Sequence, residues 1–308
     1  MANHIVCIGF DFDMPPELIG RNEFLPLSFG EAGSTALGCV LALLRARGLH
    51  TTWFMPAATI EAHRRECTLV VEGGHEIAHA GVAYNVAPSD DIMIADITRT
   101  NEVIRSLTGA MPRGFRSPLA ELSARVVDHL LDNSFVYDSS RMAFDYGAYR
   151  VQRGRGGADT PLIELPIGWA FKDFAQFSFE RSEQIMLPTP QSARTVMQTW
   201  LDEFRRMKET TESGILSYTM HPFAIGQADH LLAFEGFLTR LVEEGAAIRT
   251  MEEAARHVEK DLMPVGFGPM QSPHEPVAPE VIPIAPEVKP PRGLGSLWRR
   301  RARKEPHP

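Results

Sequence analysis

The chain has 308 residues and a mass of 34.3 kDa, which is enough for one large domain with a sizeable core. Apolar residues make up 44% and charged residues 23%, a balance that excludes a wholly disordered chain, a collagen and a long coiled coil. The net charge of −8 argues against a general nucleic-acid-binding protein, whose phosphate contacts need a basic face.

Strand-like and helix-like segments alternate along residues 1–260. In chain order we expect a strand at Ile5–Phe10, a helix at Ser34–Arg47, a strand at Thr51–Met55, a helix from Ser89 to about Leu107, a helix at Ser123–Leu131, strands at Phe135–Tyr137 and Leu162–Leu165, a helix at Pro190–Lys208, a strand at Ile215–Met220, a helix at Ala228–Glu244, a strand at Ala247–Arg249 and a helix at Met251–Val258. This alternation predicts an α/β protein with a parallel sheet or barrel and with helices outside it. Functional groups in such folds lie at the carboxyl ends of the strands.

The composition changes near residue 261. Residues 261–308 hold 11 of the 23 prolines, and their seven basic against five acidic residues give a net charge of +2. Proline-rich stretches cannot hold a helix or a central strand, so we expect a catalytic domain at 1–260 and a disordered tail at 261–308. The basic, Trp298-containing end of this tail is a candidate contact for an anionic surface.

The start of the chain and its cysteines predict a cytoplasmic protein. The chain runs from Met1 directly into the apolar strand, without a basic segment and a cleavage site. Cys7, Cys39 and Cys67 are odd in number and widely spaced, which fits a reducing compartment. The longest apolar stretch, Ala36–Leu44, is far shorter than the roughly 20 residues of a membrane-spanning helix, so we expect none.

Two clusters of side chains could bind a metal ion. Asp11 and Asp13 follow the first strand, and side chains two apart on a strand point to the same side. His75 and His79 are four apart, so on a helical turn they would share one face. Two histidines with one carboxylate suit zinc that activates a water, or ferrous iron.

Two further residues follow predicted strand ends. Arg116 stands before Ser117-Pro118, where its fork of donors could pair with a carboxylate. His221 follows the strand Ile215–Met220 directly. The order of these groups along the chain is an aspartate, a His-x3-His pair, an Arg-x-Pro turn and a histidine.

This order resembles the polysaccharide deacetylase family, the NodB-homology carbohydrate esterases. It is most similar to the cytoplasmic branch that holds a Helicobacter-type peptidoglycan deacetylase, allantoinase-like enzymes and cyclic imide hydrolases. The resemblance covers most of residues 4–258 and rests on 9–13, 29–33, 52–56, 74–79, 114–118, 135–140, 163–169, 220–222 and 225–226.

The resemblance implies a distorted (β/α) barrel of about seven strands and a hydrolase that acts on a carbon–nitrogen bond. It implies a divalent ion, Zn²⁺, held by Asp13, His75 and His79. Asp11 would be the general base, positioned by Arg116, and His221 the general acid, oriented by Asp138 or Asp173. Ser117, Pro118, Trp169 and Tyr84 would line the substrate pocket. Relatives of this kind often form homo-oligomers.

The sequence departs from the branch at Ala80, where relatives often carry a histidine, and at Gln227, where they often carry an arginine. Tyr84 stands where relatives usually carry a histidine or an aromatic residue. We expect an altered substrate from these changes. Three hypotheses stay open. The first is a metal-dependent hydrolase of the amide bond in an N-acetyl sugar or in a small N-acylated compound. The second is a cyclic imide or ureide hydrolase with little need for metal, and the third is a non-catalytic barrel that binds a partner through its tail.

Overall fold

A computed structural model describes residues 4–12, 32–81, 89–117, 122–143, 145–153, 157–177 and 191–262. All of them belong to one unit of the chain, Met1–Pro269. Three predicted site residues, Asp13, Tyr84 and Pro118, lie outside the described residues, and so does residue 263 onward of the predicted tail.

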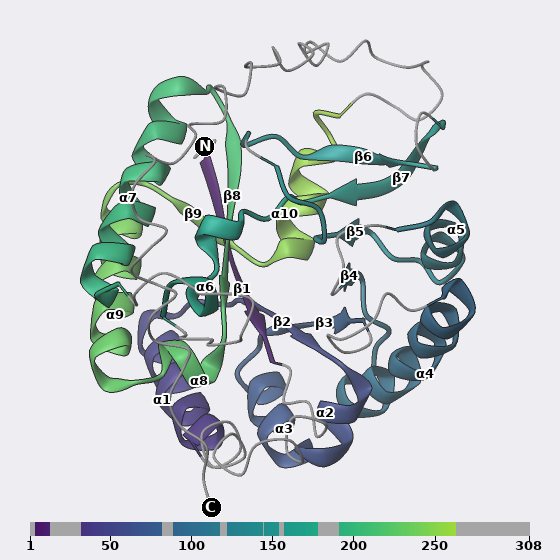
Figure 1. Cartoon of the computed structure of the whole chain (residues 1–308), viewed down its shortest axis with the longest axis horizontal. Helices are drawn as coiled ribbons and strands as arrows, with labels where there is room; N and C mark the ends of the chain where they lie inside the picture. The colour runs from purple at the N-terminus through teal and green to yellow at the C-terminus, as the bar shows by residue number, and fades with distance from the viewer. Residues whose placement is uncertain are drawn as a thin grey trace, which may run out of the picture. The chain divides into compact units, whose positions relative to one another are not determined.

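One curled sheet organises the described part of the chain (Figure 1). Its strands are β1 (His4–Asp11), β2 (Thr52–Met55), β3 (Glu76–Ala80), β4 (Gly114–Arg116), β5 (Tyr137–Asp138), β6 (Tyr149–Gln152), β7 (Asp159–Glu164), β8 (Gly214–Met220) and β9 (Ala247–Arg249). The strand order is β6-β7-β5-β4-β3-β2-β1-β8, and β9 pairs with β1 alongside β2. The named pairs are parallel, except that β6 runs antiparallel to β7. The predicted distorted barrel is therefore confirmed, with an antiparallel edge strand that the sequence did not predict.

Helices cover the outside of the curl, with α7 and α9 on one side and α4 and α5 on the other (Figure 1). The helices are α1 (Ala32–Arg47), α2 (Ala57–Ala62), α3 (Arg64–Glu72), α4 (Asp90–Thr108), α5 (Ala124–Asp132), α6 (Asp173–Phe177), α7 (Ala193–Thr210), α8 (Pro222–Ile225), α9 (Ala228–Glu243) and α10 (Met251–Val258). Unlike the outer helices, α10 contacts β1 and β5 from inside the curl.

Capping side chains fix where the main helices begin. Ser89 accepts a hydrogen bond from the amide of Ile92, and Ser123 starts α5 in the same way. Gly109 ends α4 at φ 81°, a left-handed conformation that favours glycine. The predicted start of a helix at Pro190 is too early, because Ser192 caps α7 and the helix begins at Ala193.

The sheet has two buried faces, and this division decides which predicted site residues can meet. Alternate residues of a strand point to opposite faces. Inside the curl, Cys7, Phe54, Ala78 and Tyr137 pack against Met251 of α10. On the outer face, two further cores pack strand side chains against the helices: Val6, Ile8, Phe10, Trp53 and Met55 in one, and Phe115, Phe135 and Leu162 in the other.

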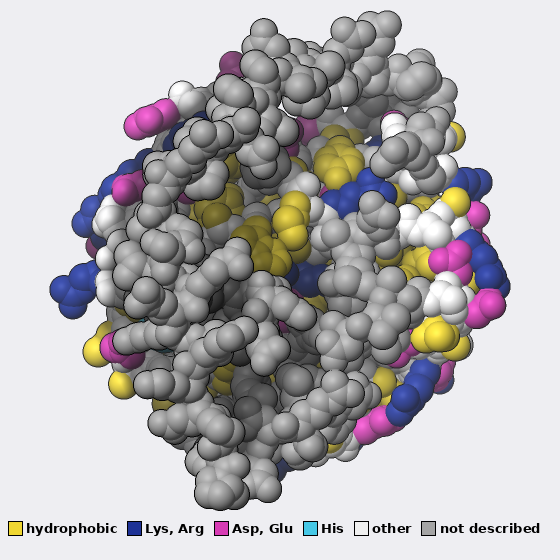
Figure 2. All heavy atoms as spheres, viewed as in Figure 1, with side chains coloured by type: hydrophobic (Ala, Val, Ile, Leu, Met, Phe, Trp, Pro, Cys, Tyr) yellow, Lys and Arg dark blue, Asp and Glu magenta, His cyan; other side chains and the backbone are white. Residues whose placement is uncertain are grey.

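The surface carries charges of both signs. Basic and acidic side chains alternate along the edge formed by α4 and α5 (Figure 2), where Arg125 pairs with Asp91 and Arg153 with Asp128. Within the described ranges, no helix has the length and apolar character that a bilayer span requires.

Candidate active site

Asp11 and Arg116 meet on the inner face of the sheet. Asp11 ends β1 and Arg116 ends β4, and Nη1 of the arginine donates to Oδ1 of the aspartate at 2.6 Å. Both side chains are buried. Because a buried charge needs a partner, each stabilises the other, and the predicted contact between Arg116 and the carboxylate is present.

Several inner-face groups hold the Arg116 guanidinium in place. Its Nε donates to the Ser139 carbonyl at 3.0 Å, and Nη2 donates to the Ser139 hydroxyl at 3.1 Å. The guanidinium also stacks 3.8 Å from the centroid of the Phe54 ring. A Cβ atom at Gly9 would lie 3.3 Å from Nη2, so the absence of a side chain there gives the arginine room. These contacts fix one geometry for Asp11.

His221 and Asp173 form the second supported pair. His221 follows β8, and its Nδ1 lies 2.7 Å from Oδ1 of Asp173, while its backbone amide donates to Oδ2 at 2.8 Å. Asp173 is fully buried and begins α6. A carboxylate on Nδ1 holds the imidazole with its Nε2 turned away from Asp173, toward Asp11.

The two pairs face each other across a short gap. Nε2 of His221 lies 3.9 Å from Oδ2 of Asp11, too long for a hydrogen bond between them. One water placed beside both atoms could bond to each. Burial alone would raise the pKa of Asp11, but the positive charges of Arg116, Lys172 and His221 together hold it below its ordinary value. Asp11 is therefore ionised at neutral pH.

His75 lies apart from this pair, at the amino end of β3. Its Nδ1 lies 3.2 Å from the Thr51 amide and 3.1 Å from the Thr51 hydroxyl, and its ring packs near Trp53. Burial, followed by the nearby His50, lowers the pKa of His75 to about 4. The ring is neutral and belongs to the outer layer.

His79 also belongs to the outer layer. It is fully buried, with its ring centroid 5.0 Å from that of Phe115 and 6.2 Å from that of Phe135. Neither ring nitrogen has a hydrogen-bond partner among the described residues, and Nε2 lies 4.0 Å from a carboxylate oxygen of Asp96 on α4. Burial lowers the pKa of His79 to about 3, so this ring is neutral too.

The predicted helical turn at His75 and His79 is therefore wrong, because β3 is a strand. Four residues of strand span about 13 Å between Cα atoms. Both rings point to the outer face, whereas Asp11 and Arg116 lie on the inner face. The inner-face neighbour of Arg116 in register is Ala80, which has no ligand atom. Among the described residues, which do not include Asp13, no three His, Cys, Asp or Glu side chains cluster as a metal site, and two rings this far apart do not fit one shared zinc ion.

Asp138 does not orient His221. It lies on the outer face beside its register partner Glu164, and its Oδ1 accepts from the Ser140 hydroxyl at 2.5 Å. Both carboxyl groups are fully buried. Burial, together with the charge of Asp138, raises the pKa of Glu164 well above its usual value, and burial also raises the pKa of Asp138. Of the two predicted orienting residues, only Asp173 contacts His221.

Two predicted substrate-binding residues lie beside the site rather than in it. Ser117 is buried, and its amide donates to the Ser140 hydroxyl at 2.8 Å. Trp169 is 60% exposed in a 3-10 helix (Trp169–Phe171) and lines a pocket of about 500 Å³ with Tyr146 and Glu203. Neither Asp11 nor His221 lines that pocket.

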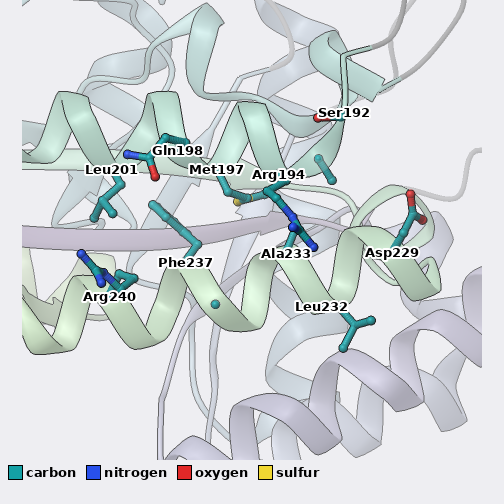
Figure 3. A pocket seen from close by; sticks show the side chains of 12 residues that line it. Ser192, Arg194, Met197, Gln198, Leu201, Asp229, Leu232, Ala233, Phe237 and Arg240 are labelled. Atoms are coloured by element: carbon teal, nitrogen blue, oxygen red, sulfur yellow. The ribbon is translucent and has the colours of Figure 1, made fainter.

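A second groove, of about 610 Å³, lies between α7 and α9 (Figure 3). Met197, Leu201 and Phe237 form its apolar floor, and Arg194 and Arg240 lie along it. No predicted site residue lines it, so it is separate from the candidate active site.

The sequence reasoning missed Lys172, Ser139 and Thr219. Thr219 accepts a weak hydrogen bond from Arg116 at 3.4 Å, and Lys172 pairs in register with Thr219. Lysine is rare in this chain, at five residues among 31 basic ones, and Lys172 directly precedes Asp173. That rarity was a signal that could have singled it out.

Comparisons with known proteins agree with this fold. A family model described as polysaccharide deacetylase matches residues 22–137. The peptidoglycan deacetylase of Helicobacter pylori is 26% identical in an alignment 266 residues long that covers 78% of this chain and 87% of that protein.

Two solved structures share the fold. One, from Mycobacterium smegmatis and assigned to the polysaccharide deacetylases, has a TM-score of 0.72 at 24% identity and covers 88% of this chain and 96% of that one. An allantoinase has a TM-score of 0.69 at 17% identity, with 84% and 91% covered. The chain is therefore similar in sequence to the polysaccharide deacetylase family over residues 22–137, and it has the curled, mostly parallel sheet of these solved structures.

Proposed function

We propose that this protein hydrolyses a non-peptide carbon–nitrogen bond, with Asp11 as general base and His221 as general acid. The observation that carries the proposal is the meeting of two supported side chains. Arg116 holds Asp11 at 2.6 Å, Asp173 holds His221 at 2.7 Å, and 3.9 Å separates the facing atoms of Asp11 and His221.

The chemistry follows from these positions. Asp11 takes a proton from a water whose oxygen forms a bond to the carbonyl carbon, and the carbonyl oxygen becomes an oxyanion. When the carbon–nitrogen bond breaks, His221 gives the proton on Nε2 to the leaving nitrogen. A proton transfer from Asp11 to His221 then restores both groups. An N-acyl amide gives a carboxylic acid and an amine, whereas a cyclic imide or ureide gives one molecule with a carboxylic acid and an amide or urea group.

The substrate is an N-acylated compound, and the family name favours an acetyl group. A cyclic imide or ureide is the second candidate, and the placement of His75 and His79 outside the site favours it, because such a hydrolase has little need for metal. No step is assigned to a zinc ion, since the outer-face histidines cannot reach Asp11. Cytoplasmic location and homo-oligomer formation stay predictions.

The test is turnover of N-acetyl sugars, small N-acyl amides, cyclic imides and cyclic ureides by the full chain. Asp11→Asn and His221→Asn should each lower turnover by at least about 10²-fold, the usual contribution of one acid or base. Asp229→Asn is the matched control, because Asp229 is exposed on α9. A wild-type protein that turns over none of the four classes would contradict the proposal and favour a non-catalytic barrel.

A further inference from the structure

We propose that the ammonium group of Lys172 supplies the positive charge that stabilises the oxyanion at the substrate carbonyl. This inference rests on the proposed function and names one more catalytic residue for it. It explains how a site of this kind could work when Ala80, the residue of β3 in register with Arg116, offers no metal ligand.

The register of the sheet places Lys172 on the correct face. Lys172 forms a parallel bridge with Thr219 of β8, and bridged residues on neighbouring strands point to the same side. Thr219 is an inner-face residue, because its hydroxyl accepts from Arg116. The side chain of Lys172 therefore leaves the backbone toward the inner face, where Asp11 and His221 meet.

The electrostatics agree with this placement. The charge of Lys172 lowers the pKa of Asp11, together with that of Arg116. The attraction between two charges weakens as the distance between them grows, so this influence agrees with the inner-face placement that the register gives to Lys172. Lys172 is also half-buried, so its charge acts in a medium less polar than water.

The other cation at the site is committed elsewhere. The nitrogens of Arg116 bind Asp11, Ser139 and Thr219, and the guanidinium stacks on Phe54, so it cannot turn toward a substrate. A lysine is a compact charge on a flexible stem, which lets it follow the carbonyl oxygen as negative charge develops. Lys172 directly precedes Asp173, the first residue of α6, which orients His221. The proposed cation and the residue that orients the general acid are therefore neighbours in the chain.

The first experiment needs no substrate. The chain has only five lysines, Lys172, Lys208, Lys260, Lys289 and Lys304. Reductive ¹³C-methylation of the full-length protein therefore gives few NMR signals, and the methylated amines keep their positive charge. The signal missing from Lys172→Arg identifies Lys172. Sodium acetate is the probe, because its carboxylate resembles the acid released by hydrolysis. We expect a saturable shift of the Lys172 signal and no shift of the Lys208 signal.

The second experiment is kinetic, on the best substrate of the panel. Lys172→Met should lower kcat by about 10²–10³-fold, the loss typical of one oxyanion donor, with KM changed less than about threefold. Lys172→Arg should recover part of the loss. Lys208→Met is the matched control, because Lys208 is on α7 and donates to the Glu244 carbonyl, far from β8's carboxyl end. Thermal melting checks that each variant is folded.

The outcomes separate this inference from the proposed function. If Asp11→Asn and His221→Asn lose turnover while Lys172→Met keeps it, the role of Lys172 is wrong and the proposed function stands. A raised KM at unchanged kcat would also overturn the role, since it indicates a lysine that binds a substrate carboxylate in the ground state. If no substrate is turned over, the proposed function fails, and a Lys172 signal that acetate does not move overturns the inference as well.

Discussion

Asp173 binds His221 twice, through the backbone amide at 2.8 Å and through Nδ1 at 2.7 Å. The double contact ties the orientation of the imidazole to the position of its own backbone. Asp173→Asn keeps the size of the side chain but offers an amide that can donate to Nδ1, which favours the wrong tautomer. We expect kcat to fall by about 10²–10⁴-fold, because the general acid is lost.

Asp138→Asn is the control for Asp173→Asn, because the sequence analysis named Asp138 as the other residue that could orient His221. It lies on the outer face beside Glu164, and we expect its kcat to stay within a few-fold of that of the unchanged protein. An Asp138 variant that loses turnover while Asp173→Asn retains it would reverse the assignment. Circular dichroism on both variants guards against a folding defect.

The contact between Arg116 and Asp11 should dominate the stability of the inner face. Arg116→Leu leaves the Asp11 carboxylate buried without its partner, which typically costs about 3–5 kcal/mol in the free energy of unfolding. Urea denaturation measures this cost. Arg125→Leu removes an exposed pair with Asp91 and should cost at most about 1 kcal/mol. Equal losses in the two variants would contradict the importance of the buried pair.

Much of the fold could be predicted from local signals. The apolar run at Ile5–Phe10 and the caps Ser89 and Ser123 mark elements that the structure has within a residue or two. The short elements were predicted unevenly. β9 has the predicted bounds, β5 was predicted two residues too early, and β4 was not predicted. β4 and β5 have three and two residues, too few for a periodic pattern, and they form because their neighbours in the sheet supply the pairing.

Part of the site could be predicted because its residues follow the ends of strands. Asp11, Arg116 and His221 come directly at strand ends, and parallel strands bring such ends together. The pair His75 and His79 misled, because a spacing of four is informative only on a helix. On a strand, alternate residues share a face. His79 therefore shares the outer face with Ile77, whereas Ala78 lies on the inner face.

His79→Phe tests that outward placement. If His79 only fills the outer core beside Phe115, phenylalanine should keep turnover within a few-fold. It should also protect the protein from acid. The unfolded chain takes a proton on His79 below its ordinary pKa of about 6.5, whereas burial holds the folded pKa at about 3. Stability is therefore lost as pH falls from about 6.5 toward 3, and His79→Phe should lose less of it in urea titrations. Abolished turnover in a folded variant would restore the metal-ligand hypothesis.

Removal of metal is a separate test of the proposed function. Prolonged dialysis against a strong chelator should leave turnover by the full chain unchanged, because the outer-face histidines cannot deliver an ion to Asp11. Metal analysis of the same sample confirms that removal is complete. The result that would count against this view is turnover that disappears with the ion, returns with added zinc and is absent from His75→Ala under both conditions.

Asp138 and Glu164 should make stability fall at high pH. Burial and mutual repulsion raise the pKa of Glu164 well above its usual value, so the folded protein holds a proton that the unfolded chain releases. Below the ordinary carboxyl pKa, Glu164 is protonated in both the folded and the unfolded chain, so its titration does not change the free energy of unfolding there. Above it, the free energy of unfolding decreases by at most about 1.4 kcal/mol per pH unit for one proton, until the raised folded pKa is reached. Glu164→Gln is neutral in both states and should flatten this slope between pH 5 and 8, as urea unfolding at several pH values would show. Glu259→Gln, at an exposed carboxyl, should keep the slope of the unchanged protein, and a Glu164→Gln variant with that same slope would rule out the buried proton.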